Sequence, residues 1–292
     1  MALNIATFKT RAATSGVFVA VMLVGLLWNH WSFFILFAVI HFGCWSEYQK
    51  LVGLIDKGYT EISPFHKYGV RLAGWCIMLY FTNDAYTLFG IKLHAIGWWL
   101  GMIAVFVLPI AELLFAKQLV LKNIAYSAFG LLYISLSWGL MMDIRCLAET
   151  WLTKTGHLYQ MGFVLPLAII FSIWANDTSA YLVGSLIGKT PFSKISPKKT
   201  WEGTLGGAVL CMVTISLVAY WLGFSWADGA AIAAIAAVVG TTGDLLESKL
   251  KRMANVKDSG NLMPGHGGFL DRFDSLLLAT PFVWLYIALF MK

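Results

Sequence analysis

Acidic, basic and histidine side chains gather near the end of this chain, although only 12% of its residues are charged. Asp271 and Asp274 stand at positions i and i+3, and Asp244 lies at the start of the same polar stretch, 244–275. Carboxylate oxygens are the ligands that Mg²⁺ takes in proteins, commonly together with phosphate oxygens of a substrate. The paired aspartates therefore indicate a site for a hard divalent cation such as Mg²⁺.

The residues around Asp244 fit one face of a helix. In TTGDLLESKLKR, residues 241–252, Asp244 is followed at i+3, i+4 and i+7 by Glu247, Ser248 and Lys251. Side chains at these intervals lie on the same side of an α-helix. If the helix continues beyond the apolar segment that precedes it, acid, hydroxyl and ammonium groups line one wall.

Between these acids lies the glycine-rich run PGHGG, residues 264–268. Its glycines allow unusual backbone angles and a close approach of a ligand to main-chain N–H groups. A glycine-rich turn that opens a helix is a ready site for an anion. The alternative is a plain turn without a ligand, and the run alone does not decide between them.

A second polar loop carries groups that suit phosphate. Its hydroxyl and basic side chains are Ser193, Lys194, Ser196, Lys198, Lys199 and Thr200. Gly188, Lys189 and Thr190 imitate the end of a P-loop, but position 183 is valine where that motif needs glycine. A loop of lysines and hydroxyls beside a loop of acids favours phosphoryl or nucleotidyl transfer to an amphiphile.

Asp177 is an additional candidate, because it lies inside an apolar segment. An ionisable side chain within a membrane is costly, and it commonly marks a functional site. The alternative is an aspartate that is hydrogen-bonded to a neighbouring helix. Asp177 therefore joins the candidate metal ligands as a further member.

The elements that must position these loops are membrane helices. The 292 residues are 59% hydrophobic, with a mean hydropathy of +0.73. Apolar blocks occur at 12–28, 31–46, 70–82, 95–116, 125–142, 161–187, 203–224, 229–243 and 276–291. A bilayer is crossed by roughly 20 residues, so we expect an all-α polytopic membrane protein with about nine transmembrane helices. The third block is interrupted and the eighth is thin, which leaves eight or ten spans as alternatives.

Lysines and arginines set the orientation, because they accumulate in cytoplasmic loops. With the N-terminus inside, 17 of the 21 basic residues are cytoplasmic, and those left outside are Lys92, Arg145, Lys154 and Lys292. We therefore predict a cytoplasmic N-terminus and an outside C-terminus. Both polar loops, 188–202 and 244–275, then lie on the cytoplasmic side, where they can meet.

The same topology predicts two regions. Residues 1–160 hold about five spans of unclear role, and residues 161–292 form a catalytic transmembrane region with both polar loops. No nucleic-acid module is visible, so the expected partners are membrane lipids and phosphate-bearing substrates. Asp177 within a span and glycine-interrupted helices leave a membrane transporter as an alternative, although no inverted repeat is visible.

These polar residues together resemble a family signature. The matching positions are Ser248, Arg252, Lys257, Asp258, Gly260, Pro264 to Gly268, Asp271, Arg272, Asp274 and Ser275, with SPKKTWEG at 196–203, Gly206, Gly207 and GDLLES at 243–248. They are similar to the phosphatidate cytidylyltransferases, or CDP-diacylglycerol synthases. The similarity covers roughly the last 115 residues, and Thr178-Ser179 departs from it where the family often has a small residue.

The resemblance implies transfer of the cytidylyl group from CTP to phosphatidate, which yields CDP-diacylglycerol and pyrophosphate for phospholipid biosynthesis. It implies assistance by Mg²⁺, with Mn²⁺ as an alternative, and a homodimer in the bacterial inner membrane with a cytoplasmic active site. A related CTP-dependent enzyme that acts on another lipid phosphate, such as a polyprenol phosphate, is the alternative. Positioning and electrostatics dominate this kind of reaction.

On the resemblance, the site residues receive expected roles. Metal coordination falls to Asp244, Asp271 and Asp274, with Asp177 as a further candidate. Substrate binding falls to Ser196, Lys198, Lys199, Thr200, Ser248, Arg252, His266, Gly267, Gly268 and Arg272. Lys257 completes the catalytic set with Asp258, which could bind metal or orient Lys257. Lys257, Arg252 and Ser248 could contact either phosphatidate or the leaving group.

Overall fold

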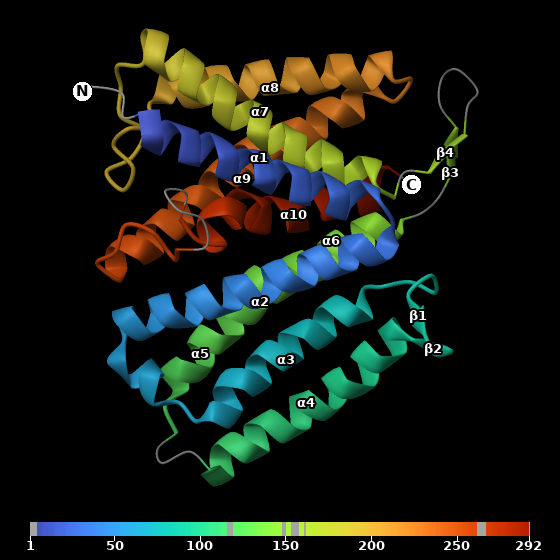
Figure 1. Ribbon diagram of the computed structural model, residues 1–292, viewed down its shortest axis with the longest axis vertical. Coiled ribbons are helices and arrows are strands. Elements are labelled where there is room, and N and C mark those ends of the chain that lie inside the picture. Colours follow the sequence, from blue (N-terminus) through green and yellow to red (C-terminus); the bar gives the residue numbers. More distant parts are fainter. Residues whose placement is uncertain are drawn as a thin grey trace. The chain divides into compact units, whose positions relative to one another are not determined.

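The structure, a computed structural model, describes residues 5–115, 119–147, 150–152, 158–160, 162–261 and 267–291. The chain forms two compact units, and each unit combines separate stretches of the sequence. Unit 1 contains residues 1–142 and 250–272, and unit 2 contains residues 143–249 and 273–292. Both units consist mainly of α-helices (Figure 1).

Unit 1 begins with two long helices and continues through shorter elements. In chain order these are α1 (Ile5–Leu27), α2 (His30–Ile55), the 3-10 helix η1 (Lys57–Glu61), α3 (Pro64–Tyr80), β1 (Thr87–Leu88), β2 (Ile91–Lys92), α4 (Leu93–Phe115), α5 (Leu121–Gly130), the π-helix η2 (Leu131–Leu136) and α6 (Ser137–Cys146), whose last turn belongs to unit 2. Helix α1 packs on α2, and α3 packs on α4 (Figure 1).

Helix α2 supplies much of the core of unit 1. Its Phe33, Phe37 and Trp45 side chains are fully buried, and they recur at the helical spacing that gives one apolar face. The polar groups on this face are paired, because Trp45 Nε1 donates to Ser135 Oγ at 2.8 Å and His41 Nε2 lies 3.0 Å from the same hydroxyl. This packing fixes the rotation of α2 and therefore the direction of Glu47.

Unit 2 contains the remaining long helices. In chain order its elements are β3 (Thr150–Leu152), β4 (Leu158–Gln160), α7 (Val164–Ile187), α8 (Trp201–Trp221), most of α9 (Trp226–Met253) and most of α10 (Leu270–Phe290). The two strands form a short hairpin. Helices α7 and α8 lie against one another, since a Cβ added at Gly207 would come within 2.7 Å of Ala180. Gly243 allows a similar approach of α9 to α10, where an added Cβ would lie 2.6 Å from Asp274 O. Small residues thus bring polar side chains of neighbouring helices together.

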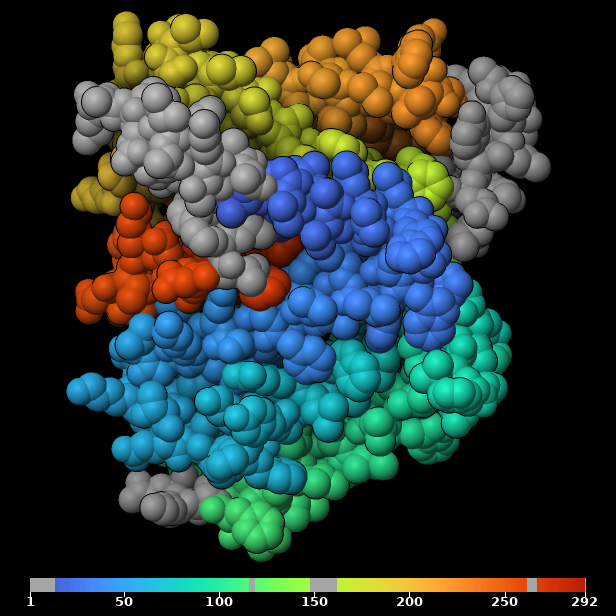
Figure 2. Space-filling view, in the orientation of Figure 1, coloured from blue at the N-terminus to red at the C-terminus, as the bar shows by residue number. Residues whose placement is uncertain are grey.

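The helices have the apolar surfaces of membrane spans. Among the described residues, six helical stretches are long and apolar enough to cross a bilayer, and these are 93–115, 121–146, 164–187, 201–221, 226–253 and 270–290. On α4, Val105, Phe106 and Leu114 are all more than 60% exposed. Figure 2 shows the α3 and α4 segments, in blue-green to green, at the surface of unit 1 in this view.

The structure confirms the expected all-α membrane protein. Each of the nine apolar blocks falls on a helical stretch, and six of these stretches meet the length and hydropathy needed for a span. The helix also continues beyond Asp244, which was the condition for a shared face with Glu247, Ser248 and Lys251, because α9 ends at Met253. Asp271 lies in the first turn of α10, as its position before the last apolar block predicts.

Candidate active site

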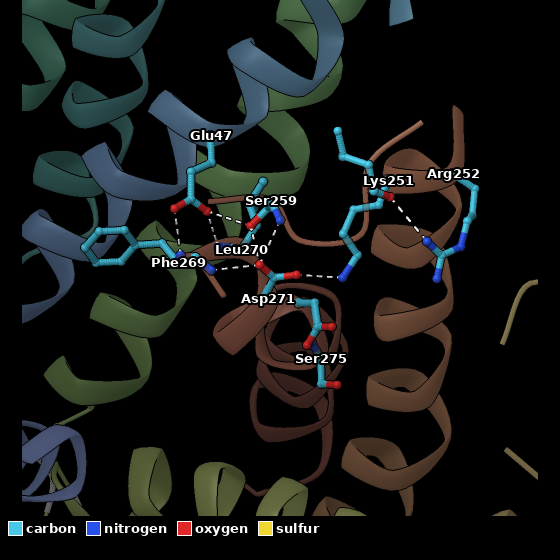
Figure 3. Close-up of polar contacts among 11 residues, drawn as sticks. Glu47, Lys251, Arg252, Ser259, Phe269, Leu270, Asp271 and Ser275 are labelled. Carbon is cyan, nitrogen blue, oxygen red and sulfur yellow. Dashed lines mark hydrogen bonds and ion pairs between the residues drawn. The ribbon is translucent and has the colours of Figure 1, made fainter. Parts of the chain in front are cut away.

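A network of hydrogen bonds in unit 1 centres on two carboxylates. We call it the Glu47 network, and it comprises Glu47 of α2, Lys251 of α9, Ser259, Gly268, Phe269, Leu270 and Asp271. Figure 3 shows both carboxylates directed at the same short piece of backbone before α10. Residues far apart in the sequence therefore meet at one helix N-terminus.

Asp271 uses both of its carboxylate oxygens within this network. Its Oδ2 accepts hydrogen bonds from Ser259 N at 2.8 Å, Ser259 Oγ at 2.8 Å and Gly268 N at 2.7 Å. Its Oδ1 accepts one from Lys251 Nζ at 2.6 Å, and the Asp271 side chain is only 9% exposed. The carboxylate thus joins Ser259, before the glycine-rich run, to Gly268, the last glycine of that run.

Glu47 binds the same segment from α2. Its Oε1 accepts from Phe269 N at 2.9 Å, and its Oε2 accepts from Leu270 N at 2.9 Å. Ser259 Oγ lies 2.7 Å from Glu47 Oε2, so its single proton is shared between Glu47 and Asp271 (Figure 3). The first N–H groups of a helix have no partner in the helix and favour a negative charge, which Glu47 supplies.

Unit 2 holds a second group of charged side chains. We call it the Asp274 cluster, and it consists of Asp177 of α7, Lys199, Asp244 and Glu247 of α9, and Asp274 of α10. Lys199 Nζ forms an ion pair with Asp244 Oδ2. Asp274 interacts electrostatically with Asp244 and Glu247, while Asp177 interacts with Lys199 and Asp244. Lys199 therefore lies close to two of these carboxylates, Asp244 and Asp177.

Two members of the Asp274 cluster are removed from solvent, since Glu247 is 0% and Asp274 is 9% exposed. The side chains of Lys199 and Asp244 are 31% and 26% exposed, and Asp177 is exposed. Among the described residues, no three His, Cys, Asp or Glu side chains are placed to hold one metal ion together. Mg²⁺ commonly takes one or two carboxylates and completes its shell with water and substrate phosphates. The pair Asp244 and Asp274 fits that smaller requirement, because it offers oxygen ligands and excess negative charge.

The loop that carries Lys199 is shaped by another glutamate. Glu202 of α8 accepts hydrogen bonds from Thr190 N at 3.1 Å and from Thr190 Oγ1 at 2.7 Å. Backbone bonds then close the loop, because Phe192 N donates to Lys199 O at 2.7 Å and Trp201 N donates to Thr190 O at 2.9 Å. The loop therefore presents its two adjacent lysines in a defined conformation, and Lys198 is exposed.

Comparison with known proteins decides which family contains this arrangement. A model of the cytidylyltransferase family matches residues 9–290. The chain belongs to the cytidylyltransferase family. The match includes both polar loops and all the helices of the two units from α2 to α10.

Several relatives carry a more specific name. The chain is 35% identical over 194 residues to the phosphatidate cytidylyltransferase of Bacillus subtilis. The aligned region covers 65% of this chain and 68% of that protein. It is 34% identical over 203 residues to the chloroplastic phosphatidate cytidylyltransferase 4 of Arabidopsis thaliana, covering 65% and 52%. It is 40% identical over 135 residues to the phosphatidate cytidylyltransferase of Synechocystis, covering 46% of each chain. The chain thus spans about half to two thirds of the length of these relatives.

The structure divides the expected site residues of this cytidylyltransferase between the two groups. Asp177, Lys199, Asp244 and Asp274 come together in unit 2, whereas Asp271 belongs to the Glu47 network of unit 1. Thr200 caps α8 by accepting a hydrogen bond from Gly203 N. Two more candidates, Ser196 and Lys198, lie in the loop before α8, and Ser248 lies on α9.

The other candidates lie around the end of α9 and the start of α10. Arg252 Nη1 donates to Val256 O at 3.2 Å, while Lys257 and Asp258 are exposed in the loop that follows. Arg272 is exposed on the first turn of α10. Gly267 has a φ of 81°, and the Gly268 N–H is taken by Asp271. His266 lies outside the described residues.

Two glutamates were not assigned a role from the sequence. Glu202 was visible only as part of the matching motif, and Glu47 stands just after the second apolar block. An ionisable residue inside an apolar segment is a recognised signal, and it marks Asp177 but not Glu47, which lies beyond its apolar block. What the sequence lacks is any sign of its partners, which are more than 200 residues away.

Proposed function

We propose that this cytidylyltransferase transfers the cytidylyl group from CTP to phosphatidate, forming CDP-diacylglycerol and pyrophosphate at the membrane surface. The ion pair between Lys199 and Asp244 carries the proposal, because it joins a phosphate-binding loop to a cluster of acids. Family membership supports a cytidylyl donor, and the relatives named phosphatidate cytidylyltransferase support the acceptor. The chain supplies the membrane helices that such an acceptor requires.

The reaction consists of one displacement at phosphorus. A phosphate oxygen of phosphatidate forms a bond to the α-phosphorus of CTP, and the bond from that phosphorus to the bridging oxygen of the β-phosphate breaks. Pyrophosphate leaves with the electron pair of the broken bond. The attacking phosphate monoester is already ionised near neutral pH, so no general base is needed. Catalysis then rests on positioning and on charge stabilisation.

The lysine loop provides positive charge for this displacement. We assign Lys198 and Lys199 to the triphosphate, where negative charge builds on the leaving pyrophosphate. The further substrate contacts proposed are Ser196, Thr200, Ser248, Arg252, Lys257, His266, Gly267, Gly268 and Arg272. Because the Glu202 carboxylate already fixes the loop, the lysines lose little additional freedom when they bind phosphate.

Asp244 and Asp274 are the proposed ligands of Mg²⁺, with Mn²⁺ as an alternative. A bound divalent cation neutralises part of the triphosphate charge. Asp177 and Asp258 remain further candidates. Asp271 is also proposed as a Mg²⁺ ligand. Lys251 and the loop backbone occupy its carboxylate oxygens, so one of these hydrogen bonds must open before the oxygen can bind a cation.

We further propose the placement of the protein. The excess of lysine and arginine supports a cytoplasmic N-terminus, nine spans, an outside C-terminus and an active site on the cytoplasmic side of a bacterial inner membrane. The resemblance to the family supports a homodimer.

Purified protein incubated with CTP, phosphatidate and Mg²⁺ should release pyrophosphate and form CDP-diacylglycerol in equal amounts. Mass spectrometry of the lipid and a coupled pyrophosphate assay measure the two products. Polyprenyl phosphate and an ether-lipid phosphate serve as competing acceptors. Turnover with either of these but not with phosphatidate would assign a different lipid, and no turnover with any acceptor would contradict the proposed function.

Replacing either of the two adjacent lysines, Lys198 or Lys199, should impair turnover strongly. Lys199→Ala and Lys198→Ala should each lower kcat/KM by about 100-fold, the typical cost of removing one group that stabilises developing charge. Steady-state assays with CTP as the varied substrate measure the loss. Lys92→Ala, in the hairpin between α3 and α4, is the control and should keep near-normal activity. Equal losses for all three variants in folded protein would remove the triphosphate assignment.

Asp274→Asn and Asp244→Asn should reduce cytidylyl transfer by orders of magnitude, because the amide loses the charge that holds a cation. Each variant should also need a higher Mg²⁺ concentration for half-maximal rate, which a Mg²⁺ titration measures. Asp84→Asn is a control, since Asp84 is 70% exposed and its partners Lys92 and His94 lie in and beside the hairpin between α3 and α4. Near-normal rates of the two site variants at limiting Mg²⁺ would refute the proposed metal ligands.

Thiol labelling should reveal the orientation. In a background without the four native cysteines, Lys194→Cys and Asn261→Cys should react with an impermeant maleimide only after the cytoplasmic side is exposed. Ala85→Cys, in the loop between α3 and α4, should react in intact cells. All three positions are exposed in the structure. Labelling of Lys194→Cys or Asn261→Cys from outside would overturn the topology.

A further inference from the structure

Glu47 lies outside the signature and on a helix of the first 160 residues, to which sequence reasoning gives no role. Its side chain accepts three hydrogen bonds, from Ser259 Oγ, Phe269 N and Leu270 N, at distances of 2.7 to 2.9 Å. All of these partners belong to the segment 259–270, which contains the glycine-rich run. One carboxylate of α2 therefore fixes both ends of that segment.

The glycines of the segment fit closely around Glu47. A Cβ added at Gly260 would overlap Glu47 Oε1, and a Cβ added at Gly268 would overlap both Glu47 oxygens. Rotating the Glu47 side chain away from either methyl group would break hydrogen bonds that its carboxylate makes to Ser259, Phe269 and Leu270. These two glycines therefore leave space for an internal carboxylate, whereas a glycine beside a ligand leaves space for that ligand.

Gly267 has a different physical requirement. Its φ of 81° lies in the left-handed region that favours glycine. A Cβ there would also come within 2.5 Å of Asp271 Oδ2. The turn before α10 is therefore shaped around two carboxylates, Glu47 and Asp271, which are linked through the hydroxyl of Ser259.

This arrangement changes how the start of α10 can be used. The amides of Gly268, Phe269 and Leu270 point at carboxylates of the chain itself. Anions bind readily to free N–H groups at a helix N-terminus. Here an internal anion takes that place, so these three amides hold the segment in shape while the hydrogen bonds stand.

We propose that Glu47 is a positioning residue for cytidylyl transfer, acting through Ser259, Asp271 and the backbone amides of Phe269 and Leu270. This inference rests on the proposed function. It assigns a task in the reaction to the N-terminal helices, because Glu47 of α2 binds Ser259, Phe269 and Leu270. Glu47 itself touches no substrate.

The first test compares Glu47→Gln with wild-type enzyme. Glutamine keeps the size but replaces one accepting oxygen by an NH₂ group that cannot accept a hydrogen bond. We expect kcat to fall by about 100-fold, the cost of a small misplacement of reacting groups, while KM for CTP changes by less than about three-fold, because Glu47 makes no substrate contact. Glu61→Gln, exposed in η1, is the matched control and should keep the wild-type values.

A second readout does not depend on activity. Hydrogen exchange followed by mass spectrometry should show faster exchange of the amides of Phe269 and Leu270 in Glu47→Gln, with the other helices unchanged. Unchanged exchange together with an unchanged kcat would overturn the inference. Faster exchange of Phe269 and Leu270 together with an unchanged kcat would show a purely structural role, and would overturn it equally.

A double-mutant cycle keeps the test decisive if Glu47→Gln folds poorly. Gly268→Ala should be impaired because its methyl group meets the carboxylate, and Glu47→Asp should be impaired because its carboxylate is one methylene shorter. Combined, the shorter side chain makes room for the methyl group, so the double variant should lose less kcat than the product of the two single losses. Strict multiplication of the losses would contradict a direct contact.

The two proposals fail in distinguishable ways. Wild-type protein that gives no product with CTP and phosphatidate would refute the proposed function. In that case the exchange rates still decide whether Glu47 holds the segment. Active wild-type protein with unaffected Glu47 variants would refute the positioning role alone.

Discussion

The fold of this protein depends on how carboxylates satisfy irregular backbone beside a membrane. A helix N-terminus presents N–H groups that have no partner within the helix, and such groups are costly when water is excluded. Glu47 and Asp271 accept the amide hydrogens of Ser259, Gly268, Phe269 and Leu270 in unit 1. In unit 2, Glu202 does the same for Lys189 and Thr190. Each polar loop thus has its own internal anion.

The acids of the chain therefore divide into two kinds. Asp271 has every oxygen bonded to backbone, hydroxyl or lysine, so its charge is matched by donors already present. Asp274, one turn later on α10, interacts with the like charges of Asp244 and Glu247. A buried cluster of like charges is stabilised by a cation, whereas a saturated carboxylate is not. Asp271 and Asp274 lie one turn apart on the same helix, yet their different neighbours give their carboxylates different chemistry.

The sequence predicts the helices well because their cause is local. Long apolar blocks fixed the approximate positions from α1 to α10. The shared face of Asp244, Glu247 and Lys251 depended on a helix that continues past its apolar block, and α9 does so. The pairing of Lys199 with Asp244 was expected only as a meeting of two loops, and the structure supplies the atoms. Glu47 could not be assigned, because 212 residues separate it from Ser259 and no local pattern records that contact.

The glycines show why a motif can be recognised before it is understood. In the sequence, a glycine-rich run before a helix indicates a site where a ligand anion approaches the backbone. In the structure, Gly260 and Gly268 leave room for Glu47, and Gly267 provides a left-handed turn over Asp271. Both explanations, a bound ligand anion and an internal carboxylate, require glycine, since each places a negative group close to the main chain. Only the origin of that group differs, and it is an internal side chain whose helix lies outside the motif. A signature of this kind thus records the shape needed around an anion, while the helix that supplies the anion can be far away in the chain.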